Sequence, residues 1–549
     1  MIRLRWGVQL AMLALFLALA AVAAWPLKSP IIPSAWLVAD PLVALVAIAS
    51  AKAVWELAAW ALVLVAATML VGRFFCGWAC PLGTTLDLGD RYLWRRRASS
   101  IDDEIRPRGR WKHYVLAVIL ASAVFGVSTG LAFDPLVLMT RTVETVLVPF
   151  VSWLGLGSVR AARLLPGHAA LSVPALETPV VYGWMTATTL ILLGIIFLGR
   201  VERRFWCRNL CPLGALLGWM SRTGLVKRHV EGDCTSCGRC ARGCPMGAIP
   251  AKDFVATHRG ECVLCLNCRE VCRAGTVRFG PNGARPAPGF VPDRRQALAA
   301  IGAGIGVGLL GAGSVRARPR PGNIIRPPGA LPEDEFLSRC TRCMACAQAC
   351  PTNGLQALGL EAGWEALWTP VLLPVRGGCE APCWNCTQVC PTGAIRKLTH
   401  EEKSFAKIGT ARVFRERCLA WEQVKACLVC DEVCPYDAID FLTITDYRGT
   451  QRRPVVHAEK CVGCGICEHE CPVREPRAIV VEHYGEERLR SGSYITPAKR
   501  QMRVVGDDRG VDYLREQRES APAPPSDGAG AGVASPPEEE PLPPGFIVK

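Results

Sequence analysis

Residues 234–245 read CTSCGRCARGCP: four cysteines are separated by two, two and three residues, and a proline follows the last one. Six groups of four with this pattern account for 24 of the 28 cysteines in the 549-residue chain. The groups are Cys234, Cys237, Cys240 and Cys244; Cys262, Cys265, Cys268 and Cys272; Cys340, Cys343, Cys346 and Cys350; Cys379, Cys383, Cys386 and Cys390; Cys418, Cys427, Cys430 and Cys434; and Cys461, Cys464, Cys467 and Cys471. Arg273 replaces the proline after the second group, and the fourth and fifth groups carry extra residues after their first cysteine.

This spacing has a chemical reason. Three thiolates on one tight loop hold one face of a [4Fe–4S] cube, and the fourth, beside proline, reaches the neighbouring cluster. Zinc also takes four cysteines, but zinc knuckles do not generally need the third cysteine and the Cys-Pro at these distances. Disulfides would leave the shared spacing unexplained. The pattern therefore predicts six [4Fe–4S] clusters.

The exchange of fourth cysteines predicts which groups share clusters. In the first pair, Cys234, Cys237, Cys240 and Cys272 would hold one cluster, and Cys262, Cys265, Cys268 and Cys244 the other. The four later groups can pair in order, or outer with outer and inner with inner. The two irregular groups lie in the middle, which favours the nested pairing.

Four apolar runs, at 6–24, 53–72, 113–133 and 181–199, are long enough, or nearly so, to cross a bilayer as helices. A signal peptide is the alternative for the first run, which Arg3 and Arg5 precede. That run is long for a signal peptide, however, and further spans follow it. We expect a shorter apolar patch at 41–50, after Asp40-Pro41, to lie at the surface.

Loop charges predict the orientation of these spans. Segments 73–112 and 200–296 carry nine and seventeen Lys or Arg, whereas 25–52 and 134–180 carry two and three. By the positive-inside rule, the N-terminus, 73–112 and 200–296 face the cytoplasm. The net charge of +15 is therefore largely an orientation signal, and we expect no nucleic-acid partner.

An internal repeat lies within the membrane part. Residues 73–83 (RFFCGWACPLG) match 204–214 (RFWCRNLCPLG), and upstream Asp40-Pro41-Leu42 matches Asp134-Pro135-Leu136. Each half contains two predicted spans, so the halves would be parallel repeats about an axis along the membrane normal.

The remaining four cysteines belong to the Cys-x3-Cys-Pro motifs of this repeat, at the cytoplasmic ends of spans: Cys76, Cys80, Cys207 and Cys211. If each motif is helical, its two cysteines share one face and lie too far apart for an unstrained disulfide. Buried small side chains before a helix-ending proline are the alternative to function. The repetition favours a redox or metal-binding role.

Residues 293–315 join the two blocks of cysteine groups. Arg294-Arg295 before a weakly apolar stretch resembles a twin-arginine (Tat) signal, although Ala297 stands where phenylalanine is usual. An ordinary span with positive flanking residues is the alternative. Both interpretations, a Tat-like signal or an ordinary span, predict that residues 316–549 lie in the periplasm. Residues 306–311 (GVGLLG) fit a dinucleotide-binding pattern, but their apolar surroundings favour close helix packing instead.

These observations predict a helical membrane domain with α+β ferredoxin-like domains. The expected parts are a four-span membrane domain (1–222), a cytoplasmic two-cluster domain (223–290), a fifth anchoring span (293–315), a periplasmic four-cluster domain (316–500) and a disordered tail (518–549). No intramembrane histidine pair or Cys-x-x-Cys-His motif indicates haem. No flavin or nucleotide site is expected, and no nucleophile–base constellation stands out.

These motifs, in this order, resemble two known families. Residues 1–290 resemble the NapH/MauN-type membrane ferredoxins, and residues 293–500 resemble the NapG/MauM-type periplasmic ferredoxins, as if the two were fused. The resemblance implies electron transfer in the bacterial inner membrane, from the quinol pool to a periplasmic reductase or c-type cytochrome of nitrate or nitrous-oxide respiration. The chain would be an electron carrier or a component of a quinol dehydrogenase.

Two other functions are compatible with the same motifs. The Cys-x3-Cys-Pro motifs could handle metal or thiols in an assembly or maturation factor for a periplasmic metalloenzyme. A redox sensor that connects the cytoplasm to the membrane is the third alternative.

Overall fold

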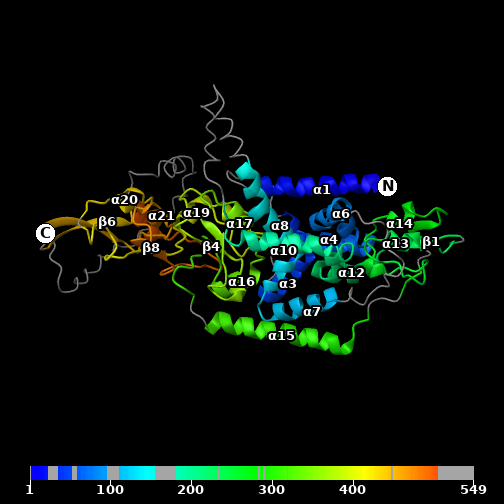
Figure 1. The fold of residues 1–549 in the computed structure, drawn as a ribbon. Coiled ribbons are helices and arrows are strands. Elements are labelled where there is room, and N and C mark those ends of the chain that lie inside the picture. Colours follow the sequence, from blue (N-terminus) through cyan, green and yellow to red (C-terminus); the bar gives the residue numbers. More distant parts are fainter. Residues whose placement is uncertain are drawn as a thin grey trace, which may run out of the picture. The chain divides into compact units, whose positions relative to one another are not determined.

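The computed structural model describes 2–22, 35–51, 59–94, 111–154, 181–232, 234–281, 285–287, 291–317, 320–423, 425–446 and 449–504 (Figure 1). All 28 cysteines lie within these ranges. The tail predicted at 518–549 lies outside the described residues, so its expected disorder stays a prediction.

Apolar helices form the N-terminal part. Helices α1 (Ile2–Val22), α4 (Ala59–Val71), α7 (Trp111–Val124) and α10 (Met185–Leu198) overlap the four predicted runs, but α7 ends well before the end of the run at 113–133, whose last part forms the 3-10 helix η3 (Thr129–Phe133). Among the described residues, three helical stretches are long and apolar enough to cross a membrane: Arg3–Ala21, Pro135–Leu154 and Arg294–Ser314. Helices α4, α7 and α10 are shorter than the ~20 residues of a full span. The apolar character of this part is therefore established, whereas the count of four spans stays a prediction.

Two segments differ from the expectation. Residues 41–50 do not lie at the surface: they form α3 (Pro41–Ala51), which is apolar all round and mostly buried. Residues 135–154, expected within an outer loop, form α8 (Pro135–Thr142), the π-turn η4 (Val143–Leu147) and a further turn of helix to Leu154. Arg141 and Glu144 interrupt the hydropathy of this stretch, yet both side chains are buried.

The internal repeat recurs in the backbone. Each motif ends a short helix, α5 (Phe74–Trp78) or α11 (Phe205–Asn209), and opens a new one, α6 (Pro81–Tyr92) or α12 (Pro212–Met220). The N–H groups of Cys80 and Cys211 donate to equivalent carbonyls, those of Phe75 and Trp206, both at 2.9 Å. Asp40 and Asp134 cap equivalent helices in the same way, because each accepts a backbone N–H two residues on at 2.8 Å.

The first cysteine block forms a small module after the helical part. Strands β1 (Lys227–Val230) and β2 (Val277–Gly280) pair antiparallel and enclose both cysteine groups in sequence. The short helices α13 (Arg239–Arg242) and α14 (Asn267–Glu270) each follow a cysteine loop. The single-turn helices η6 (Ser221–Thr223) and η7 (Arg259–Glu261) lie next to the helical part.

The second cysteine block forms a larger module with three antiparallel strand pairs. These are β3 (Leu355–Ala357) with β4 (Pro370–Leu372), β5 (Thr410–Val413) with β8 (Ile479–Glu482), and the hairpin β6 (Ile439–Asp446) with β7 (Gly449–Val456). Its helices are α16 (Glu333–Arg339), α17 (Ala345–Gln348), η8 (Trp364–Ala366), α18 (Asn385–Gln388), α19 (His400–Phe405), α20 (Val429–Glu432), α21 (Ile466–Glu470) and α22 (Pro497–Val504).

Helix α15 (Arg294–Ala317) connects the two modules and packs along α7 (Figure 1). The helices run parallel, because Gly304, Gly308 and Gly311 of α15 face successively later residues of α7 and its C-terminal extension. A Cβ at Gly308 would lie 2.7 Å from Phe125, whereas one at Gly306 would meet nothing within 4 Å. Residues 306–311 thus lie within a packed helix, and no dinucleotide-binding turn forms there.

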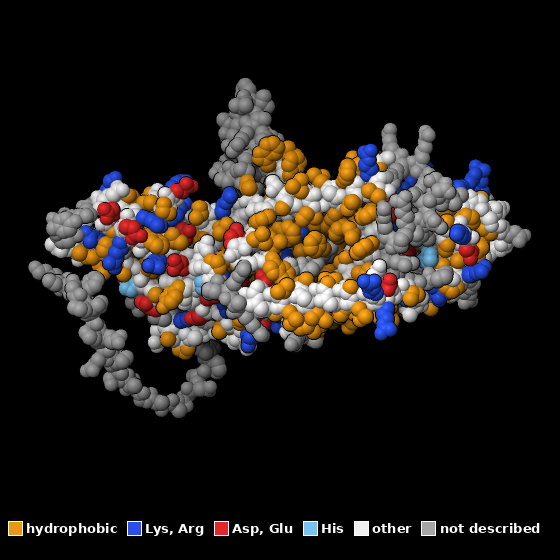
Figure 2. Space-filling model, turned by 60° about the horizontal axis from the view of Figure 1, so that its bottom comes forward, with side chains coloured by type: hydrophobic (Ala, Val, Ile, Leu, Met, Phe, Trp, Pro, Cys, Tyr) orange, Lys and Arg blue, Asp and Glu red, His pale blue; other side chains and the backbone are white. Residues whose placement is uncertain are grey.

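Hydrophobic side chains cover the face that α15 and its neighbours present in Figure 2, with few charged groups among them. The exposed side chains of α15 include Leu298, Leu309 and Leu310, of which Leu310 is 72% exposed. Exposed apolar surface of this extent on long helices is expected where lipid replaces water.

Candidate metal centres

Four of the six cysteine groups share one loop geometry. In each, the residues two and four positions after the first cysteine have left-handed backbone angles: Ser236 and Gly238, Leu264 and Leu266, Arg342 and Met344, and Gly463 and Gly465. Non-glycine residues rarely adopt this conformation. Successive turns of this kind direct backbone N–H groups into a concave nest that suits an anionic cluster. The regular groups are therefore shaped as cluster loops even where the sequence supplies no glycine.

The first module contains the two predicted sites. The thiol of Cys240 interacts electrostatically with those of Cys234 and Cys237, and Cys272 packs in the same apolar cluster as Cys240; we call these four site 1. A pocket is lined by the cysteines of site 2, namely Cys244, Cys262, Cys265 and Cys268. The exchange of the fourth cysteine proposed from sequence is therefore found at site 2.

The later groups pair in order, so the nested pairing favoured from sequence is wrong. Cys346 interacts with Cys340, Cys343 and Cys390 (site 3). One cavity is lined by Cys350, Cys379, Cys383 and Cys386 (site 4). Another is lined by Cys418, Cys427, Cys430 and Cys471 (site 5), and Cys467 interacts with Cys464, Cys461 and Cys434 (site 6). The irregular groups are accommodated by longer loops and do not need to pair with each other.

The four sites of the second module follow a spatial order that differs from their sequence order. Cys346 of site 3 interacts with Cys386 of site 4. Cys464 of site 6 interacts with Cys379 of site 4, and Cys467 of site 6 interacts with Cys430 of site 5. The sites therefore form a row in the order 3, 4, 6 and 5.

The chemistry of the cysteine sites favours metal ligation. Among the described residues, no group of three His, Cys, Asp or Glu side chains is placed to hold a single metal ion. Burial raises the pKa of Cys343 and Cys464 to about 12, and neighbouring thiols add to the effect. Such thiols stay protonated at neutral pH until metal displaces the proton, which indicates ligands and not nucleophiles.

The thiols of the two Cys-x3-Cys-Pro motifs lie in one cluster inside the helical part. Cys80 interacts with Cys76 and Cys207, and Cys211 interacts with Cys207 and Cys76. We expected each pair on one helical face, but the second cysteine of each motif is instead the N-cap of the next helix. Proline at the first helical position explains this break. The Cys211 Sγ accepts the Gly214 N–H at 3.2 Å.

Two buried arginines cross between the repeats beside these thiols. Arg204 of the second repeat forms a two-pronged ion pair with Asp87 of the first, with both N···O distances at 2.7 Å. Its Nη1 also donates to the Cys76 carbonyl at 3.1 Å. Arg5 of α1 pairs with the same Asp87 carboxylate at 3.2 Å. These three side chains form the first charge trio.

Arg73 occupies the equivalent place in the first repeat. It donates to the Gly260 carbonyl at 2.7 Å and pairs with Glu261 at 3.4 Å. Lys112 of α7 binds the same carboxylate at 2.6 Å, which completes a second charge trio. Burial alone would raise the pKa of Glu261, but attraction to Lys112 and Arg73 holds it below its usual range. This trio joins the helical part to the first module.

A further contact brings site 2 to the same place. The indole Nε1 of Trp78, within the first motif, donates to the Leu264 carbonyl at 3.0 Å. Gly77 lies so close to the Val263 backbone that a Cβ would come within 2.2 Å of its carbonyl oxygen. Both contacted residues lie on the loop of site 2.

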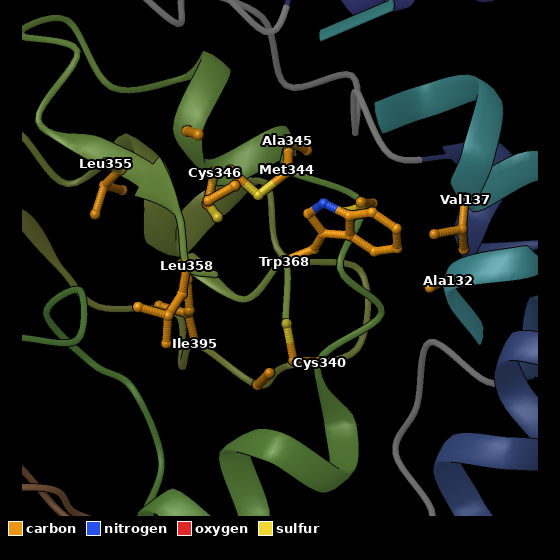
Figure 3. Close-up of a cluster of buried hydrophobic side chains, with 14 of the residues drawn as sticks. Ala132, Val137, Cys340, Met344, Ala345, Cys346, Leu355, Leu358, Trp368 and Ile395 are labelled. Carbon is orange, nitrogen blue, oxygen red and sulfur yellow. The ribbon is translucent and has the colours of Figure 1, made fainter. Parts of the chain in front are cut away.

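Site 3 meets the helical part at another place. Figure 3 shows Trp368 between Cys340 and Cys346 of the second module and Ala132 and Val137 of the helical part. The Arg141 guanidinium stacks on the Trp368 ring, 4.1 Å from its centroid.

Hydrogen bonds fix the same contact. Arg342, in the loop of site 3, donates to Ser128 Oγ at 3.0 Å and to the Glu365 carbonyl at 2.7 Å. Ser50 Oγ donates to the Ser338 carbonyl at 2.6 Å. The second module is thus held against the helical part through main-chain carbonyls.

Sequence reasoning missed the charged groups of the two trios. Arg73 and Arg204 open the two copies of the repeat, so their equivalence was visible. Their partners were not, because Asp87 and Glu261 come from different parts of the chain and break the repeat.

Three family models match four segments of the chain. A 4Fe-4S binding domain matches 53–101 and 181–231, each of which contains one Cys-x3-Cys-Pro motif. A second 4Fe-4S binding domain matches 336–356, and a 4Fe-4S dicluster domain matches 424–474.

Relatives with curated names are ferredoxin-type proteins. The chain is 36% identical over 199 residues to the methylamine utilization ferredoxin-type protein MauM of Methylophilus methylotrophus, with 34% of this chain and 84% of that protein covered. It is 37% identical over 191 residues to MauM of Paracoccus denitrificans, covering 32% and 82%. It is 35% identical over 211 residues to the ferredoxin-type protein NapG of Escherichia coli, covering 36% and 86%. No solved structure matches the chain.

Proposed function

Because the chain belongs to the ferredoxin-type protein family that includes MauM and NapG, we propose that it is a membrane-bound electron carrier. In this proposal it takes electrons from membrane quinol and passes them to a periplasmic reductase or c-type cytochrome of nitrate or nitrous-oxide respiration. Members of the family share about a third of the chain, and the remaining part supplies the membrane link.

One observation carries the proposal: the two modules contact opposite ends of the same helix. At the N-terminal end of α7, Lys112 binds Glu261 of the first module. Just beyond its C-terminal end, Ser128 Oγ donates to the Leu337 carbonyl of the second module at 2.7 Å. Helix α15 runs parallel to α7 and leads the chain from the first module to the second. This arrangement supports a cytoplasmic first module and a periplasmic second one.

The cysteines of sites 1 to 6 would hold six [4Fe–4S] clusters, which supply one-electron transfer when bound. Full or partial burial of most of these cysteines limits access of water, and the left-handed loops of four groups present backbone dipoles to the sulfurs; both tune the reduction potential. The thiols of the two Cys-x3-Cys-Pro motifs would be a redox or metal element between the modules. The protein is thus proposed as a component of a quinol dehydrogenase.

We further propose a fusion architecture. Residues 1–222 would be a NapH/MauN-type four-span domain in the bacterial inner membrane, and 223–290 its cytoplasmic two-cluster domain. Residues 293–315 would cross the membrane to the NapG/MauM-type domain at 316–500. The resemblance to MauM and NapG and the three long apolar stretches support this division.

A reduction assay tests the function. Purified full-length protein is mixed anaerobically with a short-chain quinol, and EPR spectra and visible bleaching are recorded. Quinol is expected to reduce clusters of the second module. The alternative outcome is that dithionite reduces the clusters but a quinol with a potential low enough to do so does not. That outcome would refute quinol oxidation and favour an assembly role.

A further inference from the structure

We propose that Cys76, Cys80, Cys207 and Cys211 together bind one further iron–sulfur cluster, shared between the two repeats. The metal site itself stands on the geometry below, and only its role as a link between the modules rests on the proposed function.

The first argument is the number of thiols. Each segment that matches a 4Fe-4S binding domain, 53–101 or 181–231, contains only two cysteines. A cube takes four protein thiolates, so neither segment can complete a site alone. The fold brings the two pairs together: Arg73 Nη2 lies 3.9 Å from Cys76 Sγ and 3.0 Å from the place of a Cβ at Gly214, and the Gly214 N–H donates to Cys211 Sγ at 3.2 Å. One shared site satisfies both segments.

The second argument is charge. The first trio holds Arg5, Arg204 and Asp87, and the second holds Arg73, Lys112 and Glu261, so each has two cations and one carboxylate. Five of these six residues are buried, namely the four cations and Asp87, so the buried charge is in positive excess. Buried charge in excess is costly unless an opposite charge lies nearby. Neutral thiols or disulfides would leave the excess uncompensated, whereas four thiolates around an iron–sulfur core form an anionic centre.

The third argument is that the arginines point at the thiol cluster. Arg73 Nη2 lies 3.9 Å from Cys76 Sγ, and among the described residues its Nε has no hydrogen-bond partner although the side chain is fully buried. Arg204 interacts electrostatically with Cys207 and with Cys265 of site 2. Gly83 and Gly214, at equivalent places after the motifs, leave room for Arg204 and Arg73 to cross.

The position of the site gives it a use. It adjoins the loop of site 2 through Trp78 and Gly77, and it lies inside the helical part that also contacts site 3. A cluster there would stand between the cytoplasmic and periplasmic sites, where the chain otherwise offers no metal ligands of the ferredoxin pattern.

Metal analysis of the full-length protein tests the proposal. Iron and acid-labile sulfide are measured per chain after anaerobic purification, for the wild type and for C80S/C211S. The wild type is expected to hold ~28 irons, for seven cubes of four, and the variant ~24. Cys272→Ser, which removes a ligand of site 1, is the positive control for the loss of one cluster. Equal iron in the wild type and C80S/C211S would overturn the proposal.

A second measurement does not depend on the folding of that variant. Mass spectrometry of the wild type, alkylated after anaerobic unfolding, is expected to find all four motif cysteines as free thiols. A Cys76–Cys80 or Cys207–Cys211 disulfide, or one zinc per chain in place of the extra iron, would refute the site.

The charge argument has its own test. Arg73→Gln removes a positive charge beside Cys76 and is expected to lower the reduction potential of the extra cluster, while the clusters of the second module keep their potentials. An unchanged reduction potential of the extra cluster in Arg73→Gln would contradict its placement beside Arg73. These outcomes are independent of quinol oxidation, because the cluster can be present even if quinol reduces nothing.

Discussion

The backbone N–H of Cys379 donates to the carbonyl oxygen of Cys464 at 2.7 Å. This bond joins the loop of site 4 to that of site 6, between cysteine groups that are not consecutive in the sequence. It places site 6 next to site 4, within a row that runs from site 3 against the helical part to site 5 near the β6–β7 hairpin. The site farthest along this row is therefore the expected exit for electrons.

The in-order pairing predicts which double variants lose one cluster. Cys346 and Cys390 are assigned to the same site, so C346S/C390S should lose ~4 irons per chain, no more than either single variant. C346S/C386S, which affects sites 3 and 4, should lose ~8. Iron analysis after anaerobic purification measures both. A loss of ~8 irons in C346S/C390S would restore the nested pairing.

Glycine at position 304 is predicted to be needed for the contact between α15 and α7. A Cβ there would lie 2.6 Å from the Ala121 Cβ and 2.7 Å from the Val118 carbonyl oxygen. Gly304→Ala should therefore destabilise the helical part by ~1–3 kcal/mol, the usual cost of overpacking. Gly306→Ala is the matched control, because its Cβ would meet nothing within 4 Å. Thermal unfolding in detergent compares them, and equal midpoints would contradict the packing.

Two serine hydroxyls are predicted to hold the second module in place. Ser50 Oγ and Ser128 Oγ donate to the Ser338 and Leu337 carbonyls at 2.6 and 2.7 Å. Each bond should contribute ~1 kcal/mol. S50A/S128A should accelerate amide hydrogen exchange at 336–342. Ser122→Ala is the control, since that hydroxyl bonds within α7. Exchange no faster in the double variant than in this control would argue against the contact.

Glu333 is predicted to make the second module sensitive to acid. Arg326, Arg488 and Arg320 bind its carboxylate at 2.6, 2.7 and 3.1 Å. Burial would raise the pKa of Glu333, but the arginines outweigh it and hold the pKa below its usual range. Because the pKa of Glu333 is lower in the folded than in the unfolded protein, its ionised carboxylate stabilises the fold at pH values above the unfolded-state pKa. This stabilisation is lost as the pH falls through the folded-state pKa.

Glu333→Gln should therefore lower the free energy of unfolding by ~2 kcal/mol at neutral pH. The difference in free energy of unfolding between this variant and the wild type should narrow as the pH falls below the ordinary pKa range of a glutamate. Glu335→Gln is the control on the same helix, because its partner Arg490 is 65% exposed and such pairs contribute under ~1 kcal/mol. A gap that stays constant down to acid pH would contradict the role of Glu333.

The cysteine patterns identified the candidate ligands, because ligand spacing is local and chemically constrained; that these ligands hold clusters stays a prediction. The exchange of Cys244 between neighbouring groups followed from the same rule. The pairing of the later groups did not, since it depends on how β5 and β8 bring distant loops together. Sequence irregularity in the fourth and fifth groups was a misleading guide, because loop insertions change length without changing partners.

The helical part was predicted less completely. Hydropathy located α1, α4, α7 and α10, but the sequence interpretation counted 134–180 as an outer loop and so missed the apolar helical stretch Pro135–Leu154. The repeat revealed the equivalence of Arg73 and Arg204, whereas their carboxylate partners could be found only in three dimensions.

The central claim is that the clusters of both modules belong to one electron path through the helical part. The most direct measurement uses the full-length protein in sealed lipid vesicles, with a membrane-impermeant reductant added outside only. The extent of visible bleaching is compared before and after detergent opens the vesicles. A continuous path predicts full reduction before detergent is added, whichever module faces outward. Partial bleaching that becomes complete only after detergent would show that the two modules are electrically separate.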